Sequence, residues 1–238
     1  MKRWYNANMQ NTDKLKSVLN GIDVFPTSEQ LSKLSAYFDM VVEKNKQFNL
    51  TAILSENDFV SKHYEDSLFG ASEFPVGARV LDIGCGGGFP SVPIAIMRED
   101  LSVVGIDSTA KKTVFVEGSA RELGLSNLTT VAGRAEDQKN LFGTFDAVTA
   151  RAVSSLPILL ELSAPMLKVG GTFIAYKTDE SELEPAKNAL KVLNMQFDHS
   201  KCGTLSCGEK RAILVFKKVG KTPSNYPRQY GTIKKKPL

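Results

Sequence analysis

An apolar run that ends in a glycine-rich turn constrains the fold of this chain more than any other feature. Residues 79–83 predict a short buried strand, four of the next five residues are glycine, and residues 90–97 predict the helix that leaves the turn. Open α/β sheets bind cofactors at such strand-turn-helix units, at the carboxyl ends of their strands. Glycine has no Cβ, so a ligand can lie against bare backbone. The sequence therefore predicts a cofactor site here; glycines that merely form a tight turn are the alternative.

The spacing of the glycines, together with two nearby acids, indicates which cofactor this site would bind. A dinucleotide fingerprint, G-x-G-x-x-G, that started at Gly84 would need a third glycine where the chain has Phe89. Asp82 lies just before the turn, where a buried carboxylate would repel a pyrophosphate and attract the sulfonium and ammonium groups of S-adenosylmethionine. Asp107 ends the next predicted strand and can accept hydrogen bonds from the ribose hydroxyls of either cofactor. The predicted cofactor is S-adenosylmethionine.

Strand and helix patterns alternate from residue 79 to residue 177. This alternation predicts a parallel sheet with right-handed crossovers. Ser108 is expected to cap the helix that follows Asp107. The expected strands are 79–83, 102–106, 128–131, 145–150 and 172–176, with a closing antiparallel pair at 196–202 and 211–216; the expected helices are 90–97, 108–123, 154–167 and 180–193.

The first 75 residues predict a helical cap ahead of this α/β core. After residues 1–10, which are expected to be poorly ordered, a helix is expected at 11–20. Thr27 and Gln30 have the spacing of a capping box for a helix that runs to about residue 48, and Ser55 or Asn57 can cap another. The length allows one large domain with small extensions. The expected division is 1–75 for the cap, 76–220 for the cofactor-binding core and 221–238 for a basic tail.

The positive charge of the chain is concentrated in that tail and the few residues before it. The formal net charge is +4, yet residues 217–238 hold seven lysines and arginines and no acid, so residues 1–216 carry a net charge of −3. Such a tail can contact nucleic-acid phosphates, and it can also be an ordinary solvated end. Charge alone leaves both interpretations open.

Cysteine content and hydropathy exclude several classes of protein. Three cysteines, an odd number, argue against a disulfide framework. His199, Cys202 and Cys207 match no zinc-binding spacing, so no metal site is expected. Neither a leader segment nor an apolar run long enough to span a membrane is visible. We therefore expect a cytoplasmic protein without membrane association.

Several polar residues have two interpretations. Arg151 ends a predicted strand and can orient the methionine carboxylate of the cofactor or an RNA phosphate, or it can be half of a buried ion pair. His63 can face a substrate, or it can hold two helices together, which we favour. The loop 133–136 can support an adenine ring or be an ordinary turn with an exposed Glu136.

Taken together, these segments resemble the RsmG family, also called glucose-inhibited division protein B (GidB), of bacterial 16S ribosomal RNA methyltransferases that act on guanine N7. The most selective features are the Asn-Leu-Thr segment, the Gly-Phe-Pro after the glycines and the basic tail ending in Pro-Leu. The resemblance covers nearly the whole chain. Its segments are 48–53, 63–68, 82–90, 107–108 with 111–112, 133–136, 150–153, 170–171 with 177, and 226–228 with 236–238.

The resemblance implies a class I (Rossmann-like) methyltransferase, an α/β fold with a mostly parallel seven-stranded sheet, helices on both faces and a helical N-terminal extension. It implies 16S ribosomal RNA or the 30S particle as partner, and a monomer is expected. With the arguments above, the candidate cofactor residues are Asp82, Gly84, Gly86, Phe89, Asp107, Ser108, Ala135, Glu136 and Arg151. The candidate RNA residues are Asn49, His63, Arg151, Lys177, Arg228, Lys234, Lys235 and Lys236.

No catalytic acid or base is assigned, because guanine N7 carries a lone pair and no proton. Two departures from the family pattern stand out: Cys85 replaces a frequent serine or threonine, and residues 229–233 lack a second proline. A methyltransferase for a small molecule or a protein is the rival enzyme, and a non-catalytic RNA-binding protein is the rival from another class.

Overall fold

The computed structural model describes residue 9 and residues 12–238. Two predictions, poor order at residues 1–10 and a helix start at residue 11, fall largely outside the described residues. The described Met9 is buried against the core. Within the described ranges no helix combines the length and apolarity needed to cross a bilayer.

Within residues 12–238 the strands form one seven-stranded sheet in the order β3-β2-β1-β4-β5-β7-β6. Strands β1 to β5 pair in parallel, and β7 is antiparallel to both β5 and β6. This confirms the expected parallel core and its closing antiparallel pair. The bounds are β1 Arg79–Ile83, β2 Ser102–Asp107, β3 Leu128–Ala132, β4 Phe145–Arg151, β5 Leu167–Lys177, β6 Met195–Thr204 and β7 Lys210–Lys218.

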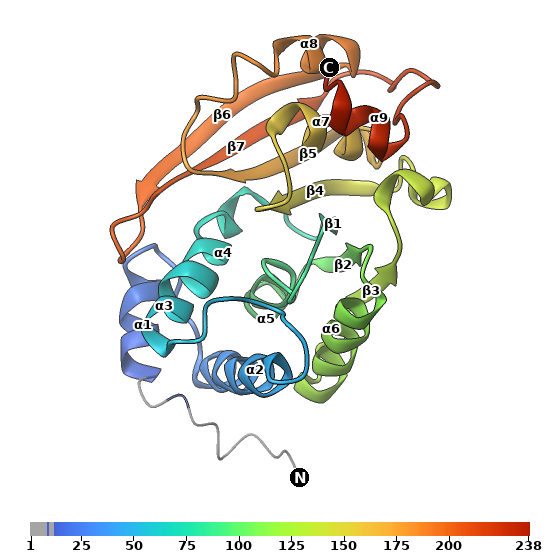
Figure 1. Ribbon diagram of the computed structural model, residues 1–238. Helices are drawn as coiled ribbons and strands as arrows, with labels where there is room; N and C mark the ends of the chain where they lie inside the picture. Colours follow the sequence, from blue (N-terminus) through green and yellow to red (C-terminus); the bar gives the residue numbers. More distant parts are fainter. Residues whose placement is uncertain (1–8, 10–11) are drawn as a thin grey trace.

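Helices cover both faces of the sheet (Figure 1). One face carries the helices from α1 to α6, and the other carries α7, α8 and α9. The bounds are α1 Thr12–Asn20, α2 Ser28–Asn45, α3 Glu56–Phe59, α4 Asp66–Phe69, α5 Ser91–Met97, α6 Ala110–Leu123, α7 Leu156–Ser163, α8 Lys187–Val192 and α9 Tyr230–Lys235. A π-helical segment, Val60–Glu65, joins α3 to α4, and 3-10 turns occupy 71–73, 135–137 and 139–141.

Two apolar cores form because side chains alternate along each strand. In β1, Val80 belongs to the core beneath α1 to α6, whereas Leu81 and Ile83 belong to the core beneath α7 to α9. The N-terminal helices thus share one continuous core with the sheet. The predicted capping box is confirmed: Thr27 Oγ1 accepts from the Gln30 amide, and the Gln30 side chain accepts from the Thr27 amide.

Several expected helices have different bounds in the structure. The helix expected at 154–167 ends at Ser163 because Pro165 has no amide hydrogen to continue it, and the chain enters β5 at Leu167. The helix expected at 180–193 shortens to α8, since Pro185 disfavours helical backbone in the residue before it. Ser108 is not a cap: α6 begins after Thr109, and no side chain caps it.

The basic tail is folded onto the sheet layer. Helix α9 lies beside α7 (Figure 1), and Ile233 is fully buried in the core of that face. The positive charge of the tail suggested a solvated end, but burial of the apolar Ile233 holds this segment against the fold.

Candidate functional site

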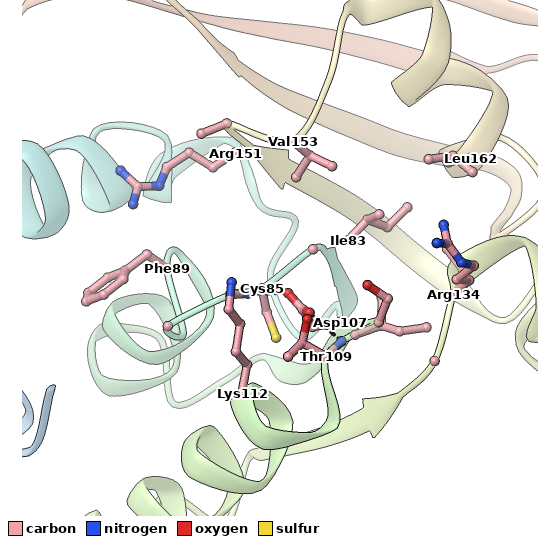
Figure 2. A pocket seen from close by; sticks show the side chains of 18 of the residues that line it. Ile83, Cys85, Phe89, Asp107, Thr109, Lys112, Arg134, Arg151, Val153 and Leu162 are labelled. Carbon is pink, nitrogen blue, oxygen red and sulfur yellow. Dashed lines mark hydrogen bonds between the residues drawn. The ribbon is translucent and has the colours of Figure 1, made fainter. Parts of the chain in front are cut away.

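A cavity of about 540 Å³ lies at the carboxyl ends of β1, β2, β3 and β4. The glycine turn lines it, as the sequence predicted, together with loops that follow the neighbouring strands. Figure 2 shows Arg151 and Phe89 on one side, Arg134 and Leu162 on the other, and Asp107 with Thr109 between them. The volume is within the range of small-molecule sites, about 300 to 1,000 Å³.

The glycine turn is held against β2 by its own backbone. The Gly84 and Cys85 amides both donate to the Ile106 carbonyl oxygen, at 2.8 and 3.0 Å. Gly84 has φ of 74°, and a Cβ at this position would lie 2.7 Å from Cγ2 of Val153. Only glycine fits there, so the bare backbone of the turn forms one wall of the cavity.

Asp107 anchors the turn from the end of β2. Its Oδ2 accepts from the Gly86 amide at 3.0 Å, and its Oδ1 accepts from the Thr109 amide at 2.8 Å. Each carboxylate oxygen retains a lone pair for a further donor. The carboxylate, with Ser108 beside it at the cavity wall, suits a ligand that presents neighbouring hydroxyl groups, as a ribose does.

Glu136 is a buried acid, and one of its oxygens accepts no hydrogen bond from the described residues. It begins the turn after β3 together with Ala135, and both line the cavity. Its side chain is 4 % exposed, and Oε1 forms no hydrogen bond within the described part of the chain; the nearest cation, Arg134, is 3.9 Å away. Buried polar atoms are seldom left unpaired. A ligand with amino or hydroxyl donors, such as adenosine, fits this end of the cavity.

Arg151 is half of a buried ion pair. Its Nη1 donates to Asp66 Oδ2 at 2.7 Å and to the Lys62 carbonyl at 2.8 Å. The guanidinium also lies over the Phe89 ring and lines the cavity. This confirms the ion-pair interpretation, while contact with a cofactor carboxylate or an RNA phosphate stays a prediction.

His63 combines both roles that the sequence left open. It comes from the π-helical segment, lines the cavity and stacks on Phe89 with ring centroids 4.1 Å apart and planes inclined by 6°. Its Nε2 is 2.9 Å from Thr51 Oγ1, which ties the Asn-Leu-Thr segment to this helix. Burial, and then the Arg151 guanidinium, lower the pKa of His63 to about 3, so the ring is neutral near pH 7.

Asp82 does not reach the cavity, contrary to the expected contact with a cofactor. The alternation along β1 turns it away from the side of Ile83, and it is fully buried against the start of α5. The Ser91 hydroxyl and amide both donate to its Oδ2, while Oδ1 lacks a partner among the described residues. Burial raises the pKa of Asp82 to about 6.

Asp82→Asn is expected to change how stability depends on pH. A carboxyl group whose pKa rises from 3.8 to about 6 on folding stabilises the fold at low pH and loses that contribution as pH rises through 6. Between pH 4 and 7 the free energy of unfolding of the variant should rise relative to wild type, by at most about 3 kcal/mol. Urea unfolding across this range measures it.

Asp146→Asn is the matched control, because Lys168 lowers the pKa of Asp146. Wild type should lose the stabilisation that Asp146 contributes as pH falls. The free energy of unfolding of Asp146→Asn relative to wild type should therefore rise as pH falls, opposite to the trend for Asp82→Asn. Equal pH trends for the two variants would contradict the role given to burial of Asp82.

The candidate RNA residues separate into two groups. Asn49 and the lysines at 234, 235 and 236 are exposed. Lys177 instead donates to Glu182 and to the Ser154 carbonyl, each at 2.8 Å. Arg228 pairs with the fully buried Glu161, which also accepts from the Arg228 amide. Both cations are engaged within the protein, Lys177 by an acid five residues away and Arg228 by one 67 residues away.

Three other residues at the cavity are not among the candidate site residues predicted from the sequence. Thr51 reaches it from the N-terminal segment, and Lys112 projects into it from the first turn of α6 (Figure 2). Tyr230 of α9 also lines it, with the Arg134 guanidinium 5.1 Å from the centre of its ring. Lys112 lies in the first turn of the helix that follows β2. Its place near the carboxyl end of that strand could have identified it as a cavity residue.

The expectation of no metal site concerned His199, Cys202 and Cys207. His199 Nε2 lies 2.9 Å from Glu73, and both cysteines are exposed free thiols. Within the described ranges no group of three or more His, Cys, Asp or Glu side chains is arranged to hold a metal ion.

Comparison with known proteins identifies close relatives in sequence. Residues 30–213 match the model of the GidB family, described as rRNA small subunit methyltransferase G. The ribosomal RNA small subunit methyltransferase G of Lactococcus lactis subsp. cremoris MG1363 is 40% identical over 236 residues, 95% of this chain and 98% of that protein. The protein of the same name from Streptococcus pyogenes serotype M3 is 43% identical over 223 residues, 89% of this chain and 93% of that protein.

Solved structures support the fold. The O-methyltransferase from Bacillus cereus in complex with SAH is 16% identical, with a TM-score of 0.54 over 87% of this chain and 100% of that chain. The [4+2]-cyclase SpnF is 16% identical, with a TM-score of 0.56 over 82% of this chain and 98% of that chain. At these identities the likeness is one of fold alone, the Rossmann-like α/β arrangement.

Proposed function

The chain belongs to the GidB family, rRNA small subunit methyltransferase G, and from this premise we propose that it transfers the methyl group of S-adenosylmethionine to N7 of a guanine in 16S ribosomal RNA. The observation that carries the proposal is the cavity beside the glycine turn, with a carboxylate at its centre and, at one end, a buried acid whose Oε1 accepts no hydrogen bond from the described residues.

The lining residues fit S-adenosylmethionine. Ala135 and Glu136 would hold the adenine, Asp107 would accept from the ribose hydroxyls, and the backbone of residues 84–87 would lie along the methionine part. Bound in this way, the cofactor would supply a methyl group on a sulfonium sulfur that keeps the electron pair of the broken bond. Asp82 is left out of this set, because it lies outside the cavity.

The residues at the other end of the cavity would position the target base. Guanine N7 attacks with its own lone pair, so the protein needs no general base and acts through orientation and exclusion of water. RNA bases that undergo chemistry are turned out of the stack, and the stacked Phe89 and His63 rings offer an aromatic wall for such a base.

Charge at this end suits a reaction that leaves the guanine positively charged. Asp66 pairs with both Arg151 and Arg211, and His63 carries no charge near pH 7. Free cations would oppose the developing charge, so this pairing favours the transfer.

Lysines 234, 235 and 236, with Asn49, are the proposed RNA contacts. They are exposed, and the lysines extend from the C-terminal half of α9, whose first residue, Tyr230, lines the cavity. Phosphate contacts of this kind make RNA binding weaken as salt rises. We further propose that the enzyme acts as a monomer on 16S ribosomal RNA or the 30S particle, which would place it in the cytoplasm.

The test is methyl transfer from labelled S-adenosylmethionine to 16S ribosomal RNA and to 30S particles, followed by mass mapping of 7-methylguanosine. Asp107→Ala should weaken cofactor binding by roughly 10- to 100-fold in isothermal titration, since it removes a charged acceptor. Asp107→Asn, which keeps one acceptor oxygen, should lose less. The exposed Asp137→Ala is the matched control and should bind like wild type.

Methylation of a small molecule or a protein, with ribosomal RNA left unmodified, would contradict the proposal. Absence of S-adenosylmethionine binding at millimolar concentration would favour a non-catalytic RNA-binding protein instead.

A further inference from the structure

A chain of hydrogen bonds leads from Asp66 to the wall of the cavity. The Arg151 guanidinium can only donate hydrogen bonds. Its Nη1 donates to Asp66, and its Nη2 lies 3.0 Å from Nδ1 of His63. A donor at this distance requires Nδ1 to be an acceptor, because two N–H groups would repel each other. The neutral His63 ring therefore carries its proton on Nε2.

This protonation fixes the direction of the next hydrogen bond. The Nε2–H of His63 faces Thr51 Oγ1 at 2.9 Å and donates to it. The Ile53 amide donates to the same oxygen at 3.0 Å. A hydroxyl oxygen has two lone pairs and one proton. Both lone pairs of Thr51 are thus occupied, and its hydroxyl can act only as a donor.

The Thr51 proton has no acceptor among the described residues. No residue in the described part of the chain accepts from this hydroxyl, and Thr51 lines the cavity. Its position is fixed, since the amides of Leu50 and Thr51 both donate to Asn45 Oδ1, at 2.7 and 3.0 Å. His63 is held by its stacking on Phe89. The result is a rigid hydrogen-bond donor beside the aromatic wall.

We propose that the Thr51 hydroxyl donates a hydrogen bond to O6 of the target guanine and so selects guanine over adenine. The inference rests on the proposed function. N7 and O6 are neighbouring acceptors on one edge of guanine, and N7 must stay free to receive the methyl group. Adenine presents an amino donor at position 6, which would leave the Thr51 donor facing another donor.

Arg151, His63 and Asp66 act through Thr51 as positioning residues. If His63 could bind its proton on Nδ1, Thr51 would donate to His63 and lose its proton for the base. Arg151 prevents this, and Asp66 holds Arg151 in place. The ion pair therefore has a role in recognition, besides its contribution to the fold.

The experiment combines protein variants with altered substrates. The methylated position is first mapped with wild-type enzyme, and 16S RNA is then assembled with guanosine, inosine or 2-aminopurine ribonucleoside at that position. Inosine keeps O6, whereas 2-aminopurine keeps N7 and lacks O6. The variants are Thr51→Val, which removes the hydroxyl at similar volume, and Thr51→Ser, which keeps it.

Wild type should lose about tenfold in kcat/KM when guanosine is replaced by 2-aminopurine, the effect of one neutral hydrogen bond. On guanosine and inosine, the kcat/KM of Thr51→Val should be about tenfold below that of wild type. On 2-aminopurine, which lacks O6, the variant and wild type should have the same kcat/KM. Thr51→Ser should behave like wild type on all three.

An equal fold-loss of Thr51→Val on all three substrates would overturn the inference, because the hydroxyl would then not sense O6. A variant with unchanged kcat/KM, or one that loses affinity for S-adenosylmethionine in isothermal titration, would also overturn it. Failure of the proposed function is distinguishable, since wild type would then form no 7-methylguanosine in unmodified RNA.

Discussion

Arg228→Met is expected to lower the free energy of unfolding by about 3 kcal/mol. The guanidinium donates to both oxygens of Glu161, at 2.8 and 2.6 Å, and Glu161 is fully buried. Removing one partner leaves a buried carboxylate without its counter-charge, which costs about 3 to 5 kcal/mol in other proteins. The lower end applies because the backbone amide of residue 228 still donates to Glu161.

Urea unfolding near pH 7 measures this loss, with Lys235→Met as the matched control. The control removes one positive charge from an exposed residue of the same segment and should change stability by less than about 0.5 kcal/mol. Arg228→Met combined with Glu161→Gln should recover part of the loss, since the buried charge is gone. Equal small effects of the two single variants would show that the ion pair does not hold the tail.

Gly88→Ala is expected to destabilise the protein by about 3 kcal/mol or more and to abolish cofactor binding. Gly88 has φ of 83°, where a side chain costs about 1 to 2 kcal/mol. The new Cβ would also lie 2.2 Å from the Tyr37 hydroxyl and 2.8 Å from Val92, in a packed region where added volume costs about 1 to 3 kcal/mol. Tyr37 is fully buried and donates to the Gly87 carbonyl, so it cannot withdraw without releasing the turn.

Gly118→Ala is the control for this substitution. Gly118 lies inside α6 with open space where a Cβ would be, so alanine should raise stability by up to about 1 kcal/mol through helix propensity. Urea unfolding and isothermal titration with S-adenosylmethionine report the two effects. A Gly88→Ala variant that unfolds and binds like wild type would contradict the packing described around Tyr37.

The sheet and its glycine turn were predictable because their signals are local. Apolar runs separated by helical patterns specify a parallel sheet, and the carboxyl ends of parallel strands meet at one edge. The amino-acid pattern alone therefore brings Gly84 and Asp107 to the same edge. Helix ends at Ser163 and Lys187 were missed, although Pro165 and Pro185 carried that information in the sequence.

Other features of the site depend on contacts between distant parts of the chain, which the sequence does not show. Nothing near Arg228 in sequence reveals Glu161, 67 residues away, so the arginine looked available to RNA. Thr51 belongs to a short connecting segment in sequence, and only the fold brings it to His63 and the cavity. Asp82 is near the turn in sequence and has the charge that a sulfonium ligand requires, but the alternation along β1 turns its side chain away from the cavity.

Helix α9 carries Tyr230 at the cavity wall and exposed lysines near its other end. If RNA binding shifts the position of this helix, it alters the affinity for the cofactor as well. Thermodynamic linkage then requires the cofactor to alter RNA affinity by the same factor. The two ligands would thus bind with a reciprocal cooperativity whose sign depends on whether RNA draws Tyr230 toward the cavity or away from it.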